Sequence, residues 1–237
     1  MKSKPREAVD KPKAIKLIIG GVAILIVGAF AARVIWNERR LTADIPMSPL
    51  VIDEDEISLE PVSAAEISDH CAEASDNALC RIGLPTIDTP DMKLVSLGTQ
   101  TKQGNTHIAS PSGLYVAGWY NGSVMPGASG ITFINAHSSN LHPAPFNRLE
   151  ELQQGDTITI ERGDGTIFTY QVSEVSRITL DAANDWVRSN LGGGNAQRQD
   201  GGENLLYLMT CVGSWSLNQG TMSERILVRA DLYSKSF

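Results

Sequence analysis

From Cys80 to the C-terminus, short segments of alternating or apolar residues are separated by turn residues, and this pattern restricts the fold more than any other sequence feature. Such runs are typical of β-strands, and Asp164-Gly165 between two of them predicts a two-residue hairpin. Helices are expected only at 146–152 and at 181–190, with Asp181 as the N-cap. Eight segments are predicted as strands: 81–87, 92–97, 106–109, 130–137, 156–162, 166–178, 204–211 and 225–233. They predict one all-β domain, closed or nearly closed into a barrel.

Residues 17–36 form an apolar run whose single charge, Arg33, lies near its end. Twenty helical residues span about 30 Å, the thickness of the hydrocarbon core of a bilayer. The run predicts one N-terminal transmembrane helix. The net charge of +4 on residues 1–16 predicts a cytoplasmic basic tail and export of residues 37–237. A cleaved signal peptide is the alternative, because small alanines end the run, although the run is longer than a usual signal segment.

The charge of the exported part is uneven. Residues 37–78 carry eleven acidic and two basic side chains, whereas residues 79–237 carry 14 acidic and 11 basic ones. The first stretch, with its prolines, predicts an acidic extracytoplasmic stalk, or an exposed linker of no specific role. The second is the predicted folded domain, residues 79–237. No nucleic-acid-binding surface is expected, because Lys and Arg do not cluster on the folded part.

The sequence contains three cysteines, Cys71, Cys80 and Cys211. Cys71 and Cys80 are nine positions apart, so they can form a disulfide only if a turn near 75–77 reverses the chain, because nine helical residues would separate them by about 13.5 Å. Two free thiols are the alternative. Cys211 is unpaired in either case, and an exported unpaired cysteine is either buried and inert or chemically reactive.

Three side chains of complementary chemistry lie at the ends of predicted strands. Cys211 ends one strand where a polar loop begins, which predicts an exposed rim position, and His137 ends another. Arg225 opens the last strand, where it faces away from the alternating core positions 226, 228, 230 and 232, as does Arg229 about 13 Å away. A thiol, an imidazole and a guanidinium together are suited to acyl transfer, as nucleophile, proton carrier and oxyanion stabiliser.

The other histidines do not form a site by their spacing. His70 lies in the predicted stalk next to Cys71, His107 lies on or beside a strand, and His142 lies in a proline-rich loop. No cluster of histidines, cysteines and acids has the spacing of metal ligands, so neither a metal nor a cofactor is expected.

Several segments, taken together, resemble the sortases, the membrane-anchored cysteine transpeptidases of bacterial surfaces. Leu208-Met209-Thr210-Cys211 is similar to the Thr-Leu-x-Thr-Cys signature of that family, and Arg225 follows the cysteine at the usual spacing. Tyr207 departs from the first threonine of the signature, and Ala136 replaces the glycine that often precedes the histidine. Further similar segments are 81–87, 116–120, 126–137 and 146–156.

The resemblance implies an eight-stranded sortase-type β-barrel with short helices over residues 79–237. It implies that Cys211 attacks a Thr-Gly type amide of a C-terminal sorting signal, that His137 acts as general acid and base, and that Arg225 stabilises the oxyanion. Thr210 would contact the substrate. The segment 179–203 would hold the sorting motif, with 181–190 as one wall.

The partners that this implies are secreted proteins with a C-terminal sorting signal, and an amine acceptor from a cell-wall precursor or a pilin. The enzyme would sit in the cell membrane through residues 17–36, with a cytoplasmic N-terminus. A non-catalytic exported β-barrel that acts as a binding module is the alternative.

Overall fold

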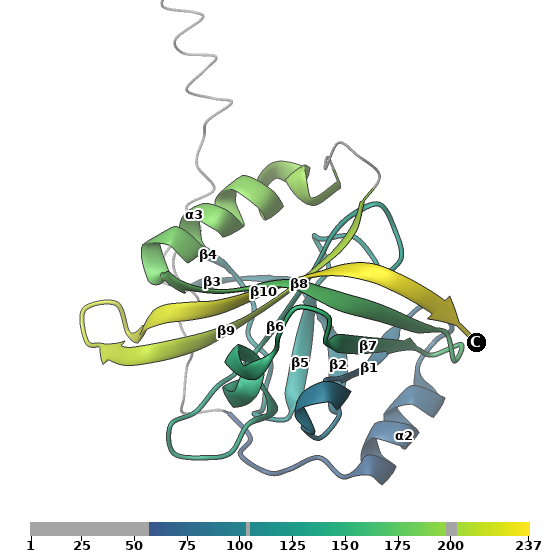
Figure 1. The fold of residues 1–237 in the computed structure, drawn as a ribbon. Helices are drawn as coiled ribbons and strands as arrows, with labels where there is room; N and C mark the ends of the chain where they lie inside the picture. Colours follow the sequence, from purple (N-terminus) through teal and green to yellow (C-terminus); the bar gives the residue numbers. More distant parts are fainter. Residues whose placement is uncertain (1–56, 103–104, 198–202) are drawn as a thin grey trace, which may run out of the picture. The chain divides into compact units, whose positions relative to one another are not determined.

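The computed structural model describes residues 57–102, 105–197 and 203–237 (Figure 1). The predicted tail 1–16, the predicted membrane helix 17–36 and the first part of the predicted stalk lie outside these residues. No helix within the described ranges combines the length and the apolar character needed to cross a membrane.

Eight strands close into a barrel, in the order β1-β2-β5-β6-β9-β10-β8-β7. The predicted all-β class and the predicted number of barrel strands are therefore confirmed. The strands are β1 (Leu79–Gly83), β2 (Met92–Leu97), β5 (Val116–Tyr120), β6 (Gly130–Ala136), β7 (Thr157–Arg162), β8 (Ile167–Thr179), β9 (Asn204–Ser216) and β10 (Thr221–Ser236). Two of the neighbouring pairs, β2 with β5 and β6 with β9, are parallel.

One predicted barrel strand is wrong. The segment 106–109 belongs to a separate two-stranded sheet of β3 (Thr99–Lys102) and β4 (Asn105–Ile108), and β5 takes its place in the barrel. The sequence pattern missed β5 because Gly118 interrupts it. A Cβ at Gly118 would come within 2.1 Å of Leu97 Cδ1 on β2, so any larger residue there would displace that leucine side chain.

Short helices lie around the barrel. The segment predicted as a helix at 146–152 is a 3-10 helix, η3 (Pro145–Glu151), preceded by another, η2 (Pro85–Ile87). The helix predicted at 181–190 is α3 (Leu180–Leu191), followed by η4 (Gly192–Gln197). Its N-cap is Thr179 and not Asp181, because the Thr179 hydroxyl accepts from the N–H of Ala182.

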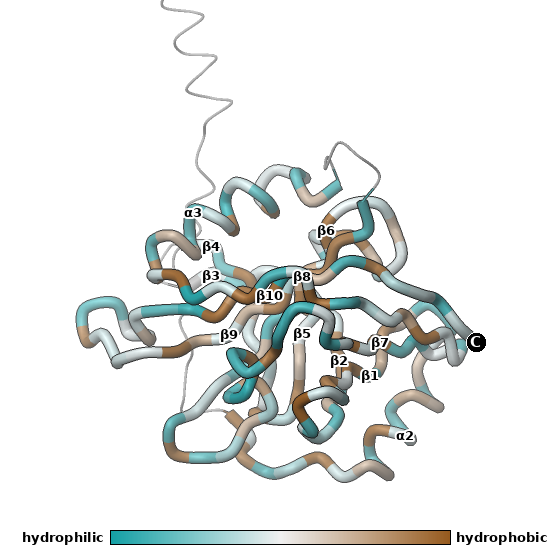
Figure 2. Tube along the Cα trace, viewed as in Figure 1, coloured by the Kyte–Doolittle hydropathy of each residue, from teal (hydrophilic) through white to brown (hydrophobic). Residues whose placement is uncertain are grey.

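The two faces of the barrel sheet have different partners. Inward side chains, including the predicted core positions Ile226, Val228 and Ala230, fill the barrel. Outward side chains of β6, β9 and β10, such as Phe133 and Met209, pack beneath α3. Figure 2 shows hydrophobic residues concentrated along the central strands. The outer face of β9 and β10 is therefore a second buried layer and not a solvated surface.

The end of the predicted stalk forms helix α2 (Ala64–Glu73), which is joined to the barrel. Ser63 and Glu66 make a capping box at its start. After Glu73 the chain leaves the helix and turns, with Ala78 N–H donating to Ser75 O at 2.8 Å. This turn brings Cys71 next to Cys80 of β1, and the two form a disulfide. Of the two alternatives for these cysteines, the disulfide is confirmed.

Candidate active site

Cys211 and Arg225 lie directly opposite each other on β9 and β10. They share the outer face of the sheet, because their neighbours Thr210 and Ile226 point the other way, into the barrel. The predicted exposed rim position of Cys211 is wrong, since its side chain is 4% exposed. β9 does not end at the cysteine: residues up to Ser216 pair with β10 and continue the ribbon beyond it. This extension of β9 was not predicted, because its polar sequence resembles that of a loop.

The guanidinium of Arg225 is completely buried and tightly held. Its Nη1 donates to the carbonyl oxygens of Met222 and Glu224, both at 2.8 Å, and its Nη2 donates to Thr221 Oγ1 at 3.0 Å. Its Nε has no hydrogen-bond partner within the described part of the chain. The other candidate, Arg229, is bound to Glu203 and Asp231, so the cation opposite the thiol is Arg225.

Burial and charge act in opposite directions on the thiol. Burial raises the pKa of Cys211, and the positive charge of Arg225 and a hydrogen bond from Thr221 lower it by less. Burial also lowers the pKa of Arg225, whereas the neighbouring Cys211 raises it. The net raised pKa means that the thiol is protonated at neutral pH, so a proton acceptor is needed to generate the thiolate nucleophile.

His137 follows directly after β6, which runs parallel to β9. Two side-chain hydrogen bonds continue this pairing beyond its last backbone pair. The Thr210 hydroxyl donates to Ala136 O at 2.9 Å, and the Ser138 hydroxyl donates to the Cys211 carbonyl. The residues just before and just after His137 are therefore both hydrogen-bonded to β9, and these bonds hold His137 beside Cys211. The Nε2 atom of His137 lies 2.8 Å from Pro111 O.

The three predicted catalytic residues thus come together from three strands. His137 and Cys211 line one small pocket of about 10 Å³, and Arg225 lies across the strand pair from the cysteine. Thr210 also lines this pocket, but its buried hydroxyl is engaged with Ala136. Its observed contact is therefore one that positions the residue before His137.

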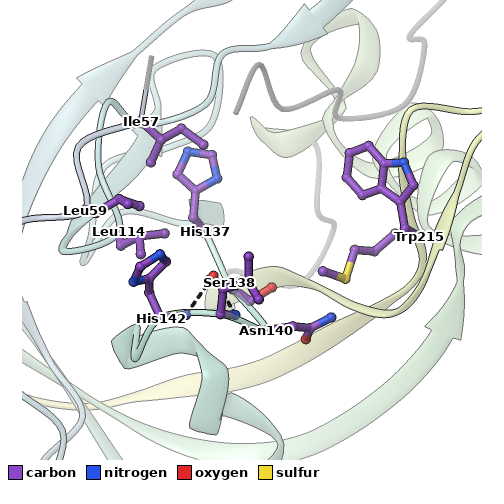
Figure 3. Close-up of a pocket in the computed structure, with 11 residues that line it drawn as sticks. Ile57, Leu59, Leu114, His137, Ser138, Asn140, His142 and Trp215 are labelled. Carbon is purple, nitrogen blue, oxygen red and sulfur yellow. Dashed lines mark hydrogen bonds between the residues drawn. The ribbon is translucent and has the colours of Figure 1, made fainter. Parts of the chain in front are cut away.

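A larger groove of about 450 Å³ opens on the other side of His137 (Figure 3). His137 lies at one side of the groove and Trp215 at the other, and most of the lining is apolar. Besides these two, the lining residues are Ile57, Leu59, Leu114, Ser138, Ser139, Asn140, Leu141, His142 and Met222. Trp215 and Leu141 are exposed there. His137 lines both this groove and the small pocket that contains Cys211.

Sequence reasoning missed the contribution of the predicted stalk to this groove. Ser58 forms a parallel bridge with Gly113, in which Ser58 N–H donates to Ser112 O at 2.8 Å and Leu114 N–H donates to Ser58 O at 2.9 Å. The same loop carries the Pro111 carbonyl that contacts His137. The segment before α2 is therefore built into the histidine side of the site. The signal in the sequence was weak: isolated apolar residues in an acidic stretch.

The remaining histidines do not line the small pocket that contains the thiol. His70 is on α2, with Nε2 3.4 Å from Leu94 O, and His107 is buried on β4. His142 lines the larger groove. In the described ranges, one group of metal-ligand type side chains is close enough to hold an ion: Cys71, Cys80 and Glu161. Its two sulfur atoms are joined in the disulfide and are not available as thiolates.

The segment 179–203, predicted to hold a sorting motif, is mainly helical. α3 covers the outer face of the barrel, where Trp186 packs against Phe133 and Tyr207 at ring-centroid distances of 5.8 and 4.6 Å. Residues 198–202 lie outside the described ranges. Residues 181–190, predicted as one wall of the sorting-motif site, therefore lie in α3, which these aromatic contacts hold against β6 and β9.

Comparisons with known proteins give one family model and several similar solved structures. A family model described as a sortase domain matches residues 85–233. No curated protein matches the chain. Similar solved structures include a pilus-related sortase C of Group B Streptococcus, with 21% identity, coverage of 79% of each chain and a TM-score of 0.47. Sortase E1 from Streptomyces coelicolor has 19% identity, coverage of 69% of this chain and 93% of that one, and a TM-score of 0.49. Sortase A from Corynebacterium diphtheriae has 20% identity, coverage of 87% and 85%, and a TM-score of 0.45.

Proposed function

Because the chain belongs to the sortase family, we propose that it is a cysteine transpeptidase in which Cys211 is the nucleophile, His137 the proton carrier and Arg225 the stabiliser of negative charge. The observation that carries the proposal is the convergence of these side chains. Cys211 and Arg225 face each other across β9 and β10, and His137 shares the small pocket with the thiol. The substrate is a protein with a C-terminal sorting signal.

In the first half-reaction, His137 takes the thiol proton, and Cys211 Sγ attacks the carbonyl carbon of the scissile amide. A C–S bond forms, and the carbonyl electron pair moves to oxygen. The Nε–H of Arg225, which has no partner in the described part of the chain, is a donor available to this oxyanion. Collapse of the intermediate breaks the C–N bond, and His137 gives its proton to the departing amine.

In the second half-reaction, an amine of a cell-wall precursor or a pilin attacks the thioester carbon. His137 removes the amine proton, a new C–N bond forms, and the C–S bond breaks. Sγ then recovers the proton from His137. One amide has been exchanged for another, so the two half-reactions together need no net oxidant or energy source.

The raised pKa of the buried thiol supports a role for the imidazole in both halves. A protonated thiol attacks slowly, because the thiolate is the nucleophile. The nearby charge of Arg225 favours the thiolate once the proton has moved. Thr210 contributes to the site through its neighbours: its hydrogen bond to the Ala136 carbonyl fixes the residue before His137.

The site of action follows from the N-terminal sequence. Residues 17–36 anchor the enzyme in the cell membrane, residues 1–16 remain in the cytoplasm, and the catalytic domain acts on the outer side. The acidic residues of 37–56 precede the segment that lines the groove. Substrates that emerge across the same membrane would meet the site close to its surface.

The experiment is a cleavage assay with a panel of fluorogenic peptides containing Thr-Gly type amides, with hydroxylamine as the amine acceptor. Wild-type protein is expected to release the fluorophore and form the hydroxamate. Cys211→Ala is expected to abolish both products. The Cys71→Ser/Cys80→Ser protein is the matched control, because it changes cysteines away from the thiol and should keep activity at temperatures where it is folded. Undiminished hydroxamate formation by Cys211→Ala would refute the proposal.

A further inference from the structure

Thr221 carries a buried hydroxyl that contacts the guanidinium of Arg225. It is the first residue of β10, and none of its surface is exposed. Its Oγ1 accepts a hydrogen bond from Arg225 Nη2 at 3.0 Å, and the hydroxyl acts to lower the pKa of the Cys211 thiol. No sequence motif drew attention to this residue, because a threonine four positions before the arginine has no pattern of its own.

We propose that Thr221 is a positioning residue that holds the Arg225 guanidinium toward Cys211 and donates its hydroxyl hydrogen to the Cys211 thiolate. A hydroxyl has one hydrogen to donate and two lone pairs that accept. Since Arg225 Nη2 occupies a lone pair, the hydrogen remains available for the sulfur. As a statement about catalysis, this rests on the proposed function, in which Cys211 is the nucleophile.

The local backbone explains how Thr221 reaches the thiol. In the strand pairing, Thr221 lies opposite Ser216, well beyond Cys211, and the register shifts between Met222 and Glu224. Such a bulge bends a strand and increases its twist. Gly213 adopts a φ of 90° at this irregularity, and a Cβ there would lie 2.6 Å from Ser223 Oγ. The positive φ favours glycine at this position, and the bulge places the bend of the ribbon between Thr221 and Arg225.

The hydrogen bonds from the two Nη atoms of Arg225 have different roles. The two bonds from Nη1 to backbone carbonyls would remain in any variant of Thr221, so the side chain would keep its general direction. The bond from Nη2 is the one that links the guanidinium to the sulfur through a hydroxyl. Removing that hydroxyl should therefore change the chemistry of the thiol much more than the fold of the barrel.

Alkylation of Cys211 by iodoacetamide tests the proposal without a peptide substrate. Cys71 and Cys80 are joined in the disulfide, so the measured alkylation is that of the free thiol Cys211. The rate constant is measured from pH 6 to 11 for the full chain in detergent. A hydrogen bond to a charged group corresponds to about 10- to 100-fold in an equilibrium constant. Thr221→Val is therefore expected to react about tenfold or more slowly at neutral pH, with an unchanged plateau at high pH.

Two variants separate the hydroxyl from the shape of the side chain. Thr221→Ser keeps the hydroxyl and is expected to restore most of the wild-type rate at neutral pH. Thr166→Val is the matched control, because Thr166 is also fully buried and accepts from an arginine, Arg162 Nη2 at 3.2 Å, at the β7–β8 turn. It should leave the pH profile of alkylation unchanged. Urea unfolding confirms that each variant is folded; if Thr221→Val is not, Thr221→Ala takes its place.

The outcomes are distinct. A pH profile displaced to higher pH in Thr221→Val and restored in Thr221→Ser supports the proposal. Equal profiles in wild type and Thr221→Val would overturn it, as would a Thr221→Ser protein as slow as Thr221→Val. The result does not depend on peptide cleavage. A displaced profile in a protein that cleaves no sorting peptide would refute the proposed function and leave the role of Thr221 toward the thiol intact.

Discussion

The disulfide between Cys71 and Cys80 is predicted to be a major source of stability for the described part of the chain. The two cysteines are nine positions apart, and the bond ties α2 to β1. Closing a loop of this length lowers the conformational entropy of the unfolded chain, which corresponds to about 2.6 kcal/mol at 25 °C. The double variant Cys71→Ser/Cys80→Ser is therefore expected to have a free energy of unfolding lower by that amount.

Urea unfolding under oxidising conditions measures this difference, and the expected loss would move the midpoint by about 1 M. Dithiothreitol should lower the wild-type midpoint to that of the double variant and leave the double variant unchanged. Cys211→Ser is the control for the loss of a thiol outside the disulfide. A difference below about 1 kcal/mol between wild type and the double variant would refute the loop-entropy reasoning. So would a midpoint that dithiothreitol does not move.

Three further predictions concern the site and its support. Burial raises the pKa of Cys211 above its ordinary value, so the folded state holds this proton to higher pH than the unfolded state does. Above pH 9, wild type should lose up to about 1.4 kcal/mol of stability per pH unit relative to Cys211→Ser, measured by urea unfolding; parallel curves would contradict this. Trp186→Ala should cost about 2–3 kcal/mol, because α3 loses its contacts with Phe133 and Tyr207; an unchanged midpoint would contradict it. Ser58→Pro removes the N–H donated to Ser112 O and should lower kcat about tenfold, with KM less affected, in the peptide assay. Unchanged kcat in folded Ser58→Pro protein would show that the bridge does not support His137.

The sequence was informative wherever structure follows from local pattern. Alternation on the last strand correctly placed Ile226, Val228 and Ala230 in the core. Asp164-Gly165 does lie in the turn between β7 and β8, but the connection spans residues 163–166 and is not the predicted two-residue hairpin. The sequence pattern failed at β5, where a glycine in close contact with β2 removed the alternation. The predicted N-cap of α3 was wrong by two residues. Thr179 and Asp181 are both good capping residues, and the helix begins directly after Thr179.

The candidate site, too, could be predicted from the sequence only in part. The chemical types of Cys211, His137 and Arg225 indicated acyl transfer when they were expected at strand ends, and the resemblance to the sortases implied a role for each of them. Their surroundings were not predictable. The exposed rim expected for Cys211 is a buried position, because a polar segment that resembles a loop finds backbone partners on β10. The hydroxyl of Thr221 joins the site for the same reason.

The sequence by itself determined the all-β class, seven of the eight barrel strands and the candidate catalytic side chains, because periodicity and residue type are local properties. Tertiary structure decided which segments form the barrel, that the thiol is buried, and that the segment at Ser58 supports the loop next to His137. These features depend on pairing between distant parts of the chain: Thr210 and Ala136, for example, are 74 positions apart. Such contacts are selected by the packing of the whole barrel, and no local pattern encodes them.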